Sequence, residues 1–309
     1  MKASRESSEL SLSATDLSAF SECEHKTTLD LAVAFGQLTR PGENEIERKM
    51  LEKRGFEHEA RVLAHLQATR QSVVKINAGP GEASRNEAAR ATERAMQDGA
   101  EVIAQGVLSH GNWFGRPDFL LKIAGESRFG AHGYVVADAK LANEAKARAV
   151  LQLCAYSELL HVAQGGKEPE LFYIAPGGGE KVKLVPLRTA DYSSYYRLAK
   201  RRFEAFVQSD RERAIYPEPV EHCGVCGWWK RCEERRRSDD HLSLVAGITT
   251  RQRDRLSTAG IARVTELGSL DRAQRVPGIA KESLERVREQ ARLQVAGRSQ
   301  PKPLYELLL

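Results

Sequence analysis

Short apolar runs with strand-like spacing occupy the middle of the chain. Residues 134–140 predict a strand, and residues 102–123 predict a hairpin that turns near Gly111. Two further strands are expected over residues 171–175 and 181–187. Because side chains alternate between the two faces of a strand, this spacing also predicts which residues share a face.

Helical periodicity flanks these strands on both sides. In the second predicted helix, Phe56, Ala60 and Leu63 form an apolar stripe that we expect to face the core. The predicted helices cover residues 16–34, 43–68, 88–96, 145–163 and 191–208. This order of elements predicts an α/β fold, in which a mixed sheet is flanked by helices.

The composition changes at the charged run 235–240, which predicts a domain boundary there. We expect a polar N-terminal arm over residues 1–15, a main domain over 16–237, a small all-α domain over 238–297 and a linker over 298–309. The small domain contains a weak internal repeat, because residues 244–248 and 275–279 each place an apolar-glycine-apolar turn between helical patterns.

Composition mainly excludes some classes of protein. Of the 309 residues, 41% are hydrophobic and 29% are charged, as in an ordinary folded protein, and the net charge of +5 favours a polyanionic partner only weakly. No stretch approaches the roughly 20 apolar residues of a membrane-spanning helix, and the polar N-terminus differs from a signal peptide. We therefore expect a cytoplasmic protein with no membrane partner, whose five cysteines are metal ligands or buried thiols rather than disulfides.

The most informative chemistry lies at the end of the strand 134–140. Alternation places Asp138 and Lys140 on one face, and a second acid, Asp118, lies twenty residues earlier. Two carboxylates can hold Mg²⁺ or Mn²⁺, the carbonyl of Ala139 could add an oxygen ligand, and a nearby ammonium can stabilise charge on a phosphodiester under attack. The alternative is that Asp118 caps a turn and Asp138 merely ends a strand, because acid-x-Lys triplets are common.

The helix that follows could bring one more polar group to this place. At 100° per residue, Gln152 shares a face with Tyr156, Leu159 and Ala163. An amide on an apolar face needs a hydrogen-bond partner, so a helix beside the strand could point Gln152 at the metal or the scissile phosphate. The alternative is a Gln152 that is bonded to the sheet edge or half exposed.

A compact group of cysteines suggests a second metal site. Cys223, Cys226 and Cys232 lie in a polar, turn-rich segment where packing alone does not explain three thiols, and Cys23 could complete a four-thiolate site. Four thiolates accept either Zn²⁺ or an iron–sulfur cluster. Cys154 lies inside the helix 145–163 and is expected to be a structural thiol.

Two features could contact a nucleic-acid backbone. Arg197 and Arg201 belong to a basic stretch of the helix 191–208, although solvated surface charge explains any single one of them equally well. The turn at residues 276–279 resembles a helix-hairpin-helix element, in which Gly278 would let backbone N–H groups at a helix N-terminus approach a phosphate. Gly247, in the related turn, would be its partner.

Three segments together resemble the RecB-like branch of the PD-(D/E)XK nuclease superfamily. They are Gly115-Arg116-Pro117-Asp118-Phe119-Leu120, Asp138-Ala139-Lys140 and Gln152-Leu153-Cys154-Ala155-Tyr156. The resemblance covers about residues 16–232, and it implies a restriction-endonuclease-like core whose active site is formed by Asp118, Asp138 and Lys140. It also implies that Gln152 and Tyr156 carry the branch's Gln-x3-Tyr helix.

The same resemblance adds two expectations that the residues alone do not give. The run Arg54-Gly55-Phe56-Glu57-His58-Glu59 matches an Arg-Gly-x-x-His-Glu context, which implies that His58 binds metal, with His65 as its rival. One upstream cysteine followed by C-x2-C-x5-C is similar to the iron–sulfur site of RecB-like nucleases, including the CRISPR-adaptation exonucleases. The resemblance thus implies a [4Fe–4S] cluster on Cys23, Cys223, Cys226 and Cys232, with zinc as the second choice.

The combined expectation is a Mg²⁺- or Mn²⁺-dependent deoxyribonuclease, preferably an exonuclease on single-stranded DNA or DNA ends in repair or processing. The resemblance also suggests further nuclease or helicase domains, fused or bound. One alternative is a non-catalytic nucleic-acid-binding module of a larger protein. Another is a nuclease directed at RNA, because no residue is recognisable as a reader of the 2′-hydroxyl.

Overall fold

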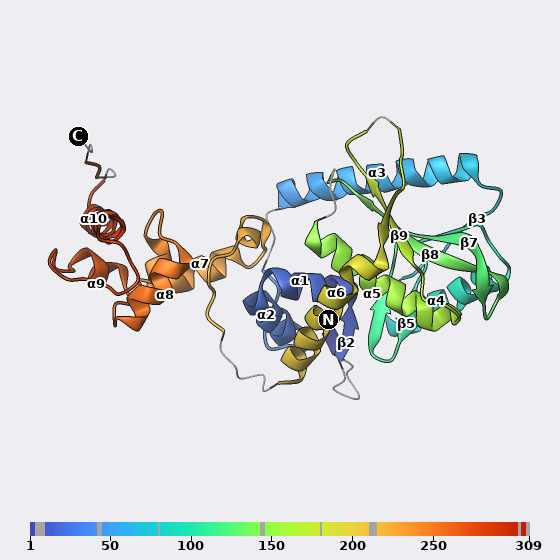
Figure 1. Ribbon diagram of the computed structural model, residues 1–309, viewed down its shortest axis with the longest axis horizontal. Helices are drawn as coiled ribbons and strands as arrows, with labels where there is room; N and C mark the ends of the chain where they lie inside the picture. Colours follow the sequence, from blue (N-terminus) through green and yellow to red (C-terminus); the bar gives the residue numbers. More distant parts are fainter. Residues whose placement is uncertain are drawn as a thin grey trace. The chain divides into compact units, whose positions relative to one another are not determined.

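The computed structural model describes residues 1–3, 10–41, 45–79, 81–142, 146–179, 181–209, 215–301 and 304–306 (Figure 1). The chain forms two compact units, Met1–Ile215 and Tyr216–Leu309. This division falls earlier than the predicted boundary after residue 237, so the segment with three cysteines lies in the second unit. In the described residues, no helix is both long enough and apolar enough to cross a membrane.

A six-stranded mixed sheet forms the centre of the first unit, in the order β10-β9-β8-β7-β4-β3. Its strands are β3 (Val73–Lys75), β4 (Val102–Ala104), β7 (Phe119–Ser127), β8 (Gly130–Lys140), β9 (Leu171–Pro176) and β10 (Val185–Arg188). The long strands β7 and β8 pair antiparallel, and β8 pairs parallel with β9. A parallel pair needs a crossover connection, which helix α5 (Ala147–Gln164) provides between β8 and β9.

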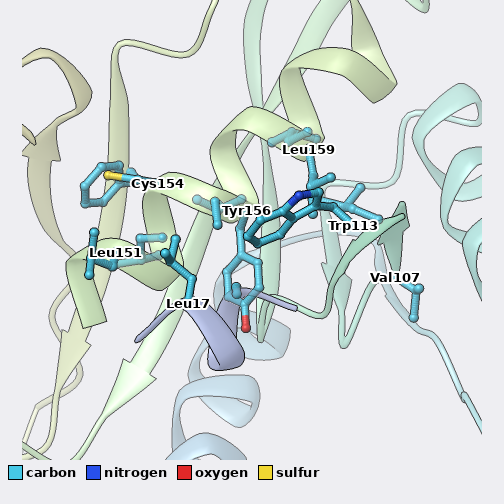
Figure 2. Packing of buried hydrophobic residues seen from close by; sticks show 14 of the residues in the cluster. Leu17, Val107, Trp113, Leu151, Cys154, Tyr156 and Leu159 are labelled. Carbon is cyan, nitrogen blue, oxygen red and sulfur yellow. The ribbon is translucent and has the colours of Figure 1, made fainter. Parts of the chain in front are cut away.

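Helices cover the two faces of this sheet. On one face, α3 (Glu45–Thr69) packs Val62 and Leu66 against a cluster that includes Val135 and Ala137 of β8. On the other face, α5 contributes to a larger cluster that includes Tyr134 and Val136. Figure 2 shows part of this larger core, with Leu151, Cys154, Tyr156 and Leu159 of α5 among buried residues from other elements. The predicted α/β architecture with a mixed sheet flanked by helices is confirmed.

The apolar stripe predicted for α3 is wrong. Phe56 is 69% exposed, whereas His58 is 4% exposed and lies on the buried side with Val62 and Leu66. These three residues are spaced four apart, so they share one face of the helix. Because this buried face includes a polar histidine, the pattern of apolar residues did not predict it.

A second, four-stranded sheet has the order β1-β2-β6-β5. Its strands are β1 (Lys2–Ala3), β2 (Leu10–Ser13), β5 (Leu108–His110) and β6 (Trp113–Gly115). The predicted polar arm therefore contains a paired strand with a buried Leu12, although residues 4–9 lie outside the described residues. The predicted hairpin over residues 102–123 is confirmed, because β4 pairs with β7 and β5 pairs with β6 in one antiparallel register about Gly111. Its base lies in the six-stranded sheet and its tip lies in the four-stranded sheet, a division that the sequence did not predict.

The segment predicted as one helix over residues 16–34 forms two helices. Helix α1 (Ala14–Glu22) ends at Cys23, whose extended backbone (φ −163°, ψ 108°) also starts α2 (Glu24–Ala34). Helix α1 packs on α5, and α6 (Thr189–Gln208) packs on both. Helix α4 (Glu82–Gln97) contacts β4 and β5 and is longer than predicted.

The second unit is helical and has its own apolar core, which includes Leu242, Leu256, Val264, Val276 and Leu284. Its elements are η1 (Glu221–Val225), α7 (Trp229–Ser238), η2 (Leu242–Leu244), α8 (Thr250–Thr258), α9 (Val264–Gly268) and α10 (Lys281–Gly297). The predicted linker begins directly after α10, and its residues 302–303 and 307–309 lie outside the described residues.

Candidate active site

Asp138 and Lys140 lie at the C-terminal end of β8, on the face covered by α5. The Lys140 Nζ atom is 2.6 Å from Asp138 Oδ2, and the two side chains are 28% and 3% exposed, respectively. Their neighbours Val135 and Ala137 belong to the core on the opposite face. The predicted alternation is therefore confirmed, and it places an ion pair where the strand emerges from the core.

Asp118 joins this pair through two hydrogen bonds between neighbouring strands. Its backbone N–H donates to Asp138 Oδ1 at 3.0 Å, and its Oδ2 accepts from the Ala139 N–H at 2.8 Å. The antiparallel register, in which Phe119 pairs with Ala137, brings the start of β7 to the end of β8. Two acids twenty residues apart are thus held side by side by backbone geometry.

The electrostatics of this pair favour a cation. Desolvation and the nearby Asp138 charge raise the pKa of Asp118 well above its usual range, against the opposing effect of Lys140. Desolvation lowers the pKa of Lys140, but the charges of Asp138 and Asp118 outweigh it and leave that pKa raised. A group of this kind favours added positive charge, because a nearby cation stabilises the carboxylate form.

Helix α5 brings Gln152 to the same ion pair. Lys140 Nζ donates to Gln152 Oε1 at 3.3 Å. The Gln152 amide nitrogen lies 3.5 Å from the Thr15 hydroxyl and 3.4 Å from the Ser18 hydroxyl, both on α1. The structure thus brings Gln152 to Lys140, with partners on α1 that orient its amide, and its predicted direction toward a metal or phosphate stays a prediction.

Tyr156 lies one turn further along α5 and is 7% exposed. Burial raises the pKa of its phenol, and the charges of Asp138 and Asp118 raise it further. A hydrogen bond with Thr15 lowers this pKa by a smaller amount. Tyr156 is therefore a neutral hydroxyl near the acids. Its ring packs closely over the backbone of Gly115 in β6.

His58 lies one strand away from the acids, and both of its ring nitrogens have protein partners. Nε2 donates to the Ala175 carbonyl at 2.9 Å, and Nδ1 accepts from Arg61 at 2.9 Å. Ala175 pairs with Ala139 across β8 and β9. For His58 to bind a metal ion, one of these two hydrogen bonds must be released, so its metal role stays a prediction.

Two further polar residues belong to the site and were missed from the sequence. Gln105, directly after β4, donates through its side-chain nitrogen to Glu59 Oε1 and, at 3.4 Å, to Asp118 Oδ1. Glu59 also raises the pKa of Asp118. Its place beside His58 could have suggested Glu59, whereas the sequence holds no signal for Gln105.

As the side chains stand in the described residues, no three His, Cys, Asp or Glu groups gather around one point that could hold a metal ion. The oxygen donors that converge are those of Asp118 and Asp138, with Glu59 linked through Gln105. Carboxylate oxygens are the ligands that Mg²⁺ and Mn²⁺ prefer, so the donor chemistry suits these ions.

The four cysteines of the expected cluster lie in both units, three in the second and one in the first. In the second unit, Cys226 and Cys232 are each 8% exposed, and the Val220 N–H donates to Cys223 Sγ at 3.4 Å. In the first unit, Cys23 starts α2, where its Sγ accepts from the Lys26 N–H at 3.3 Å. Burial raises the pKa of Cys154 to about 12, as expected of a structural thiol.

The two glycine turns of the second unit have the same geometry. The Ile248 N–H donates to the Val245 carbonyl at 3.2 Å, and the Ile279 N–H donates to the Val276 carbonyl at 3.1 Å. Gly247 (φ 75°) and Gly278 (φ 81°) both adopt the left-handed conformation that favours glycine. Helices α8 and α10 follow these turns, so the weak sequence repeat reflects a structural one.

The basic residues of α6 and α7 differ in whether acidic or backbone partners already bind them. Arg197 and Arg201 are exposed on α6 and are open to a ligand. On α7, Arg235 and Arg237 pair with acids four residues away, and the buried Arg236 donates to the Pro217 carbonyl. Of these three arginines, Arg236 is the one whose contact is buried inside the second unit.

Compared with known protein families and with curated proteins, the sequence gives no match.

Proposed function

We propose that the protein is a metal-dependent nuclease that hydrolyses phosphodiester bonds, with DNA as its substrate. The observation that supports this most is the convergence of Asp118, Asp138 and Lys140 between β7 and β8, with Gln152 reaching them from α5. Two acids and one ammonium group in contact, partly open to solvent, form the minimal apparatus for metal-assisted attack on a phosphodiester.

The side chains would divide the work as follows. Asp118 and Asp138, together with the Ala139 carbonyl, would hold Mg²⁺ or Mn²⁺, which supplies charge stabilisation and a more acidic water. Lys140 keeps its ammonium form and would stabilise negative charge on the phosphate oxygens. Gln152, fixed by Thr15 and Ser18, would orient Lys140 or the substrate.

The order of elements around the site supports a restriction-endonuclease-like core. Helix α3 is followed by the antiparallel pair β7 and β8, the crossover helix α5 and the parallel strand β9. The segments that resemble RecB-like nucleases fall on the corresponding parts of this arrangement, at the start of β7, the end of β8 and the first turns of α5.

We also propose a [4Fe–4S] cluster on Cys223, Cys226, Cys232 and Cys23, with zinc as the alternative. Backbone N–H groups donate to the sulfurs of Cys223 and Cys23, and such hydrogen bonds to sulfur are a feature of iron–sulfur sites. Anaerobically purified protein should then be brown, with broad visible absorption and about four iron atoms per chain. Colourless protein that contains zinc would contradict the iron–sulfur assignment.

The second unit would contact the nucleic-acid backbone as a helix-hairpin-helix module. A Cβ atom at Gly247 would meet no atom within 4 Å, so no side chain covers this turn at that point. At Gly278, the Arg255 side chain lies over the turn and could contact a phosphate itself. Arg197 and Arg201 would add contacts that do not depend on base sequence.

The decisive experiment measures cleavage of end-labelled single-stranded DNA, duplex DNA and RNA, with and without Mn²⁺. Asp138→Asn preserves the shape of the side chain and an acceptor for the Asp118 N–H, but it removes the charge. Asp191→Asn, at an exposed acid of α6, is the matched control. Mn²⁺-dependent cleavage that only Asp138→Asn abolishes would support the nuclease.

The same measurement separates the alternatives. Tight DNA binding without cleavage by the wild type would favour a non-catalytic binding module, and preferential cleavage of RNA would favour the RNA-directed nuclease. Cleavage that persists undiminished in Asp138→Asn would remove the proposed active site. The melting temperature of each variant must match that of the wild type, because Asp138 is buried and its substitution could also destabilise the fold.

A further inference from the structure

Gln105 has an unusual backbone conformation beside the candidate site. Its φ is 57°, in the left-handed region, and among the described residues Asp240 is the other non-glycine residue with a positive φ. A residue with a Cβ atom adopts this conformation rarely, and such residues gather at functional sites. Gly106 follows directly and would be the easier residue to place in this conformation, so the chain accepts strain at a glutamine.

In this conformation, both the backbone N–H and the side-chain amide of Gln105 lie close to Asp118. The Gln105 N–H donates to the Asp118 carbonyl at 2.8 Å, and its side-chain nitrogen lies 3.4 Å from Asp118 Oδ1. The other carboxylate oxygen, Oδ2, accepts from the Ala139 N–H. Each oxygen of Asp118 thus has one donor from a neighbouring strand end, which fixes the plane of the carboxylate.

The same amide also holds a second acid. Gln105 also donates to Glu59 Oε1 of α3, so its one NH2 group lies between the carboxylates of Glu59 and Asp118. Two like charges would otherwise repel each other and turn apart. Glu59 is thereby kept close to Asp118, although its neighbour His58 points to β9 instead.

We propose that Gln105 is a positioning residue of the cation site, which holds Asp118 and Glu59 in the orientation that a divalent ion requires. This inference rests on the proposed function, because it supplies the support for carboxylates that would hold the metal. Residues that orient metal ligands without touching the ion typically change metal affinity by about 10- to 100-fold when they are removed.

Three variants distinguish the effect of the Gln105 side-chain amide from the effect of its backbone strain. Gln105→Gly removes the amide and relieves the left-handed strain, whereas Gln105→Ala removes the amide and keeps the strain. Gln105→Glu keeps the shape but replaces the donor with a third negative charge. Asp138→Asn reports on the cation site itself, and Glu87→Gln, on the exposed surface of α4, is the control for a lost charge.

The test measures how tightly the full chain binds Mn²⁺. The electron paramagnetic resonance signal of unbound Mn²⁺ gives the affinity, and melting temperatures are measured in parallel. We expect Gln105→Gly and Gln105→Ala to bind Mn²⁺ about 10- to 100-fold more weakly than the wild type, although the Gly variant melts at a higher temperature than the Ala variant. Gln105→Glu is expected to bind with altered affinity as well, without the orientation that the amide provides.

Two negative outcomes have different meanings. Wild-type affinity in Gln105→Gly, with weakened binding in Asp138→Asn, would overturn the positioning role and leave the proposed function intact. Wild-type affinity in Asp138→Asn, or no Mn²⁺ binding by the wild type, would overturn the proposed function and this inference together.

Discussion

Gly115 packs tightly against Tyr156 beside the candidate site, and this contact allows a sharp test of the packing. A Cβ atom at Gly115 would lie 2.6 Å from Tyr156 Cδ1, 2.9 Å from Tyr156 Cε1 and 3.0 Å from Leu159 Cδ1. Optimal separations of carbon atoms are about 3.5–4.0 Å, so Gly115→Ala must push α5 or the tyrosine ring aside.

The size of the effect follows from how little space is available. Tyr156 is 7% exposed and Leu159 is 5% exposed, so neither side chain can move into solvent. One extra methyl group in a well-packed core typically costs about 1–3 kcal/mol. In a unit of this size, each kcal/mol lowers the melting temperature by roughly 2–4 °C, so we expect Gly115→Ala to melt about 2–12 °C lower than the wild type.

Gly55→Ala is the matched control, because it makes the same change where nothing lies within 4 Å of the new Cβ atom. Gly55 is inside α3, so alanine should stabilise the helix by about 0.5–1 kcal/mol. Thermal unfolding followed by circular dichroism should therefore shift in opposite directions for the two variants. An unchanged or raised melting temperature for Gly115→Ala would refute the packing described around Tyr156.

Three other predictions concern the second unit and the cysteines. Burial lowers the pKa of His241, whose Nδ1 accepts from the Ser243 N–H, so protonation must break this bond. Stability should then fall as the pH drops below about 6.5, where the unfolded histidine gains a proton first, and His241→Gln should flatten this fall in urea titrations at pH 7 and 5.5. Gly278→Ala should destabilise the protein more than Gly247→Ala in the same assay. Both residues are left-handed, but only at Gly278 would the new Cβ atom meet a side chain, at 2.9 Å from Arg255 Nε; equal effects would contradict this contact. Cys23→Ala should lower the melting temperature of the cluster-containing protein markedly, because a ligand bridge that closes a loop of about 200 residues can offset roughly 5 kcal/mol of chain entropy; a mutant that melts like the wild type would exclude Cys23 as a ligand.

Strand parity explains why part of the candidate site could be predicted from the sequence. Asp138 and Lys140 must share a face once residues 134–140 form a strand, and their ion pair agrees with that rule. Helical periodicity likewise gave Gln152 and Tyr156 a common face of α5. These relations are local, so no knowledge of the rest of the chain is needed.

The remaining members of the site depend on contacts that no local pattern encodes. Gln105 reaches the site because its backbone is left-handed and its amide contacts Glu59 of α3 and Asp118, the residue before β7. These partners are 46 and 13 residues away in the sequence. The buried face of α3 was missed because His58 occupies an apolar spacing. The hairpin over residues 102–123 was predicted correctly, but the division of its strands between two sheets was not, because that division depends on long-range pairing with β2, β3 and β8.

The hydroxyls of Thr15 and Ser18 have a practical consequence for anyone who trims this chain. A fragment that begins at α3 would keep both acids and the ammonium group, yet it would lack the α1 partners that orient Gln152 and the strand β2 that pairs with β6. A trimmed fragment that keeps these contacts must therefore start no later than residue 10, where β2 begins, upstream of α1.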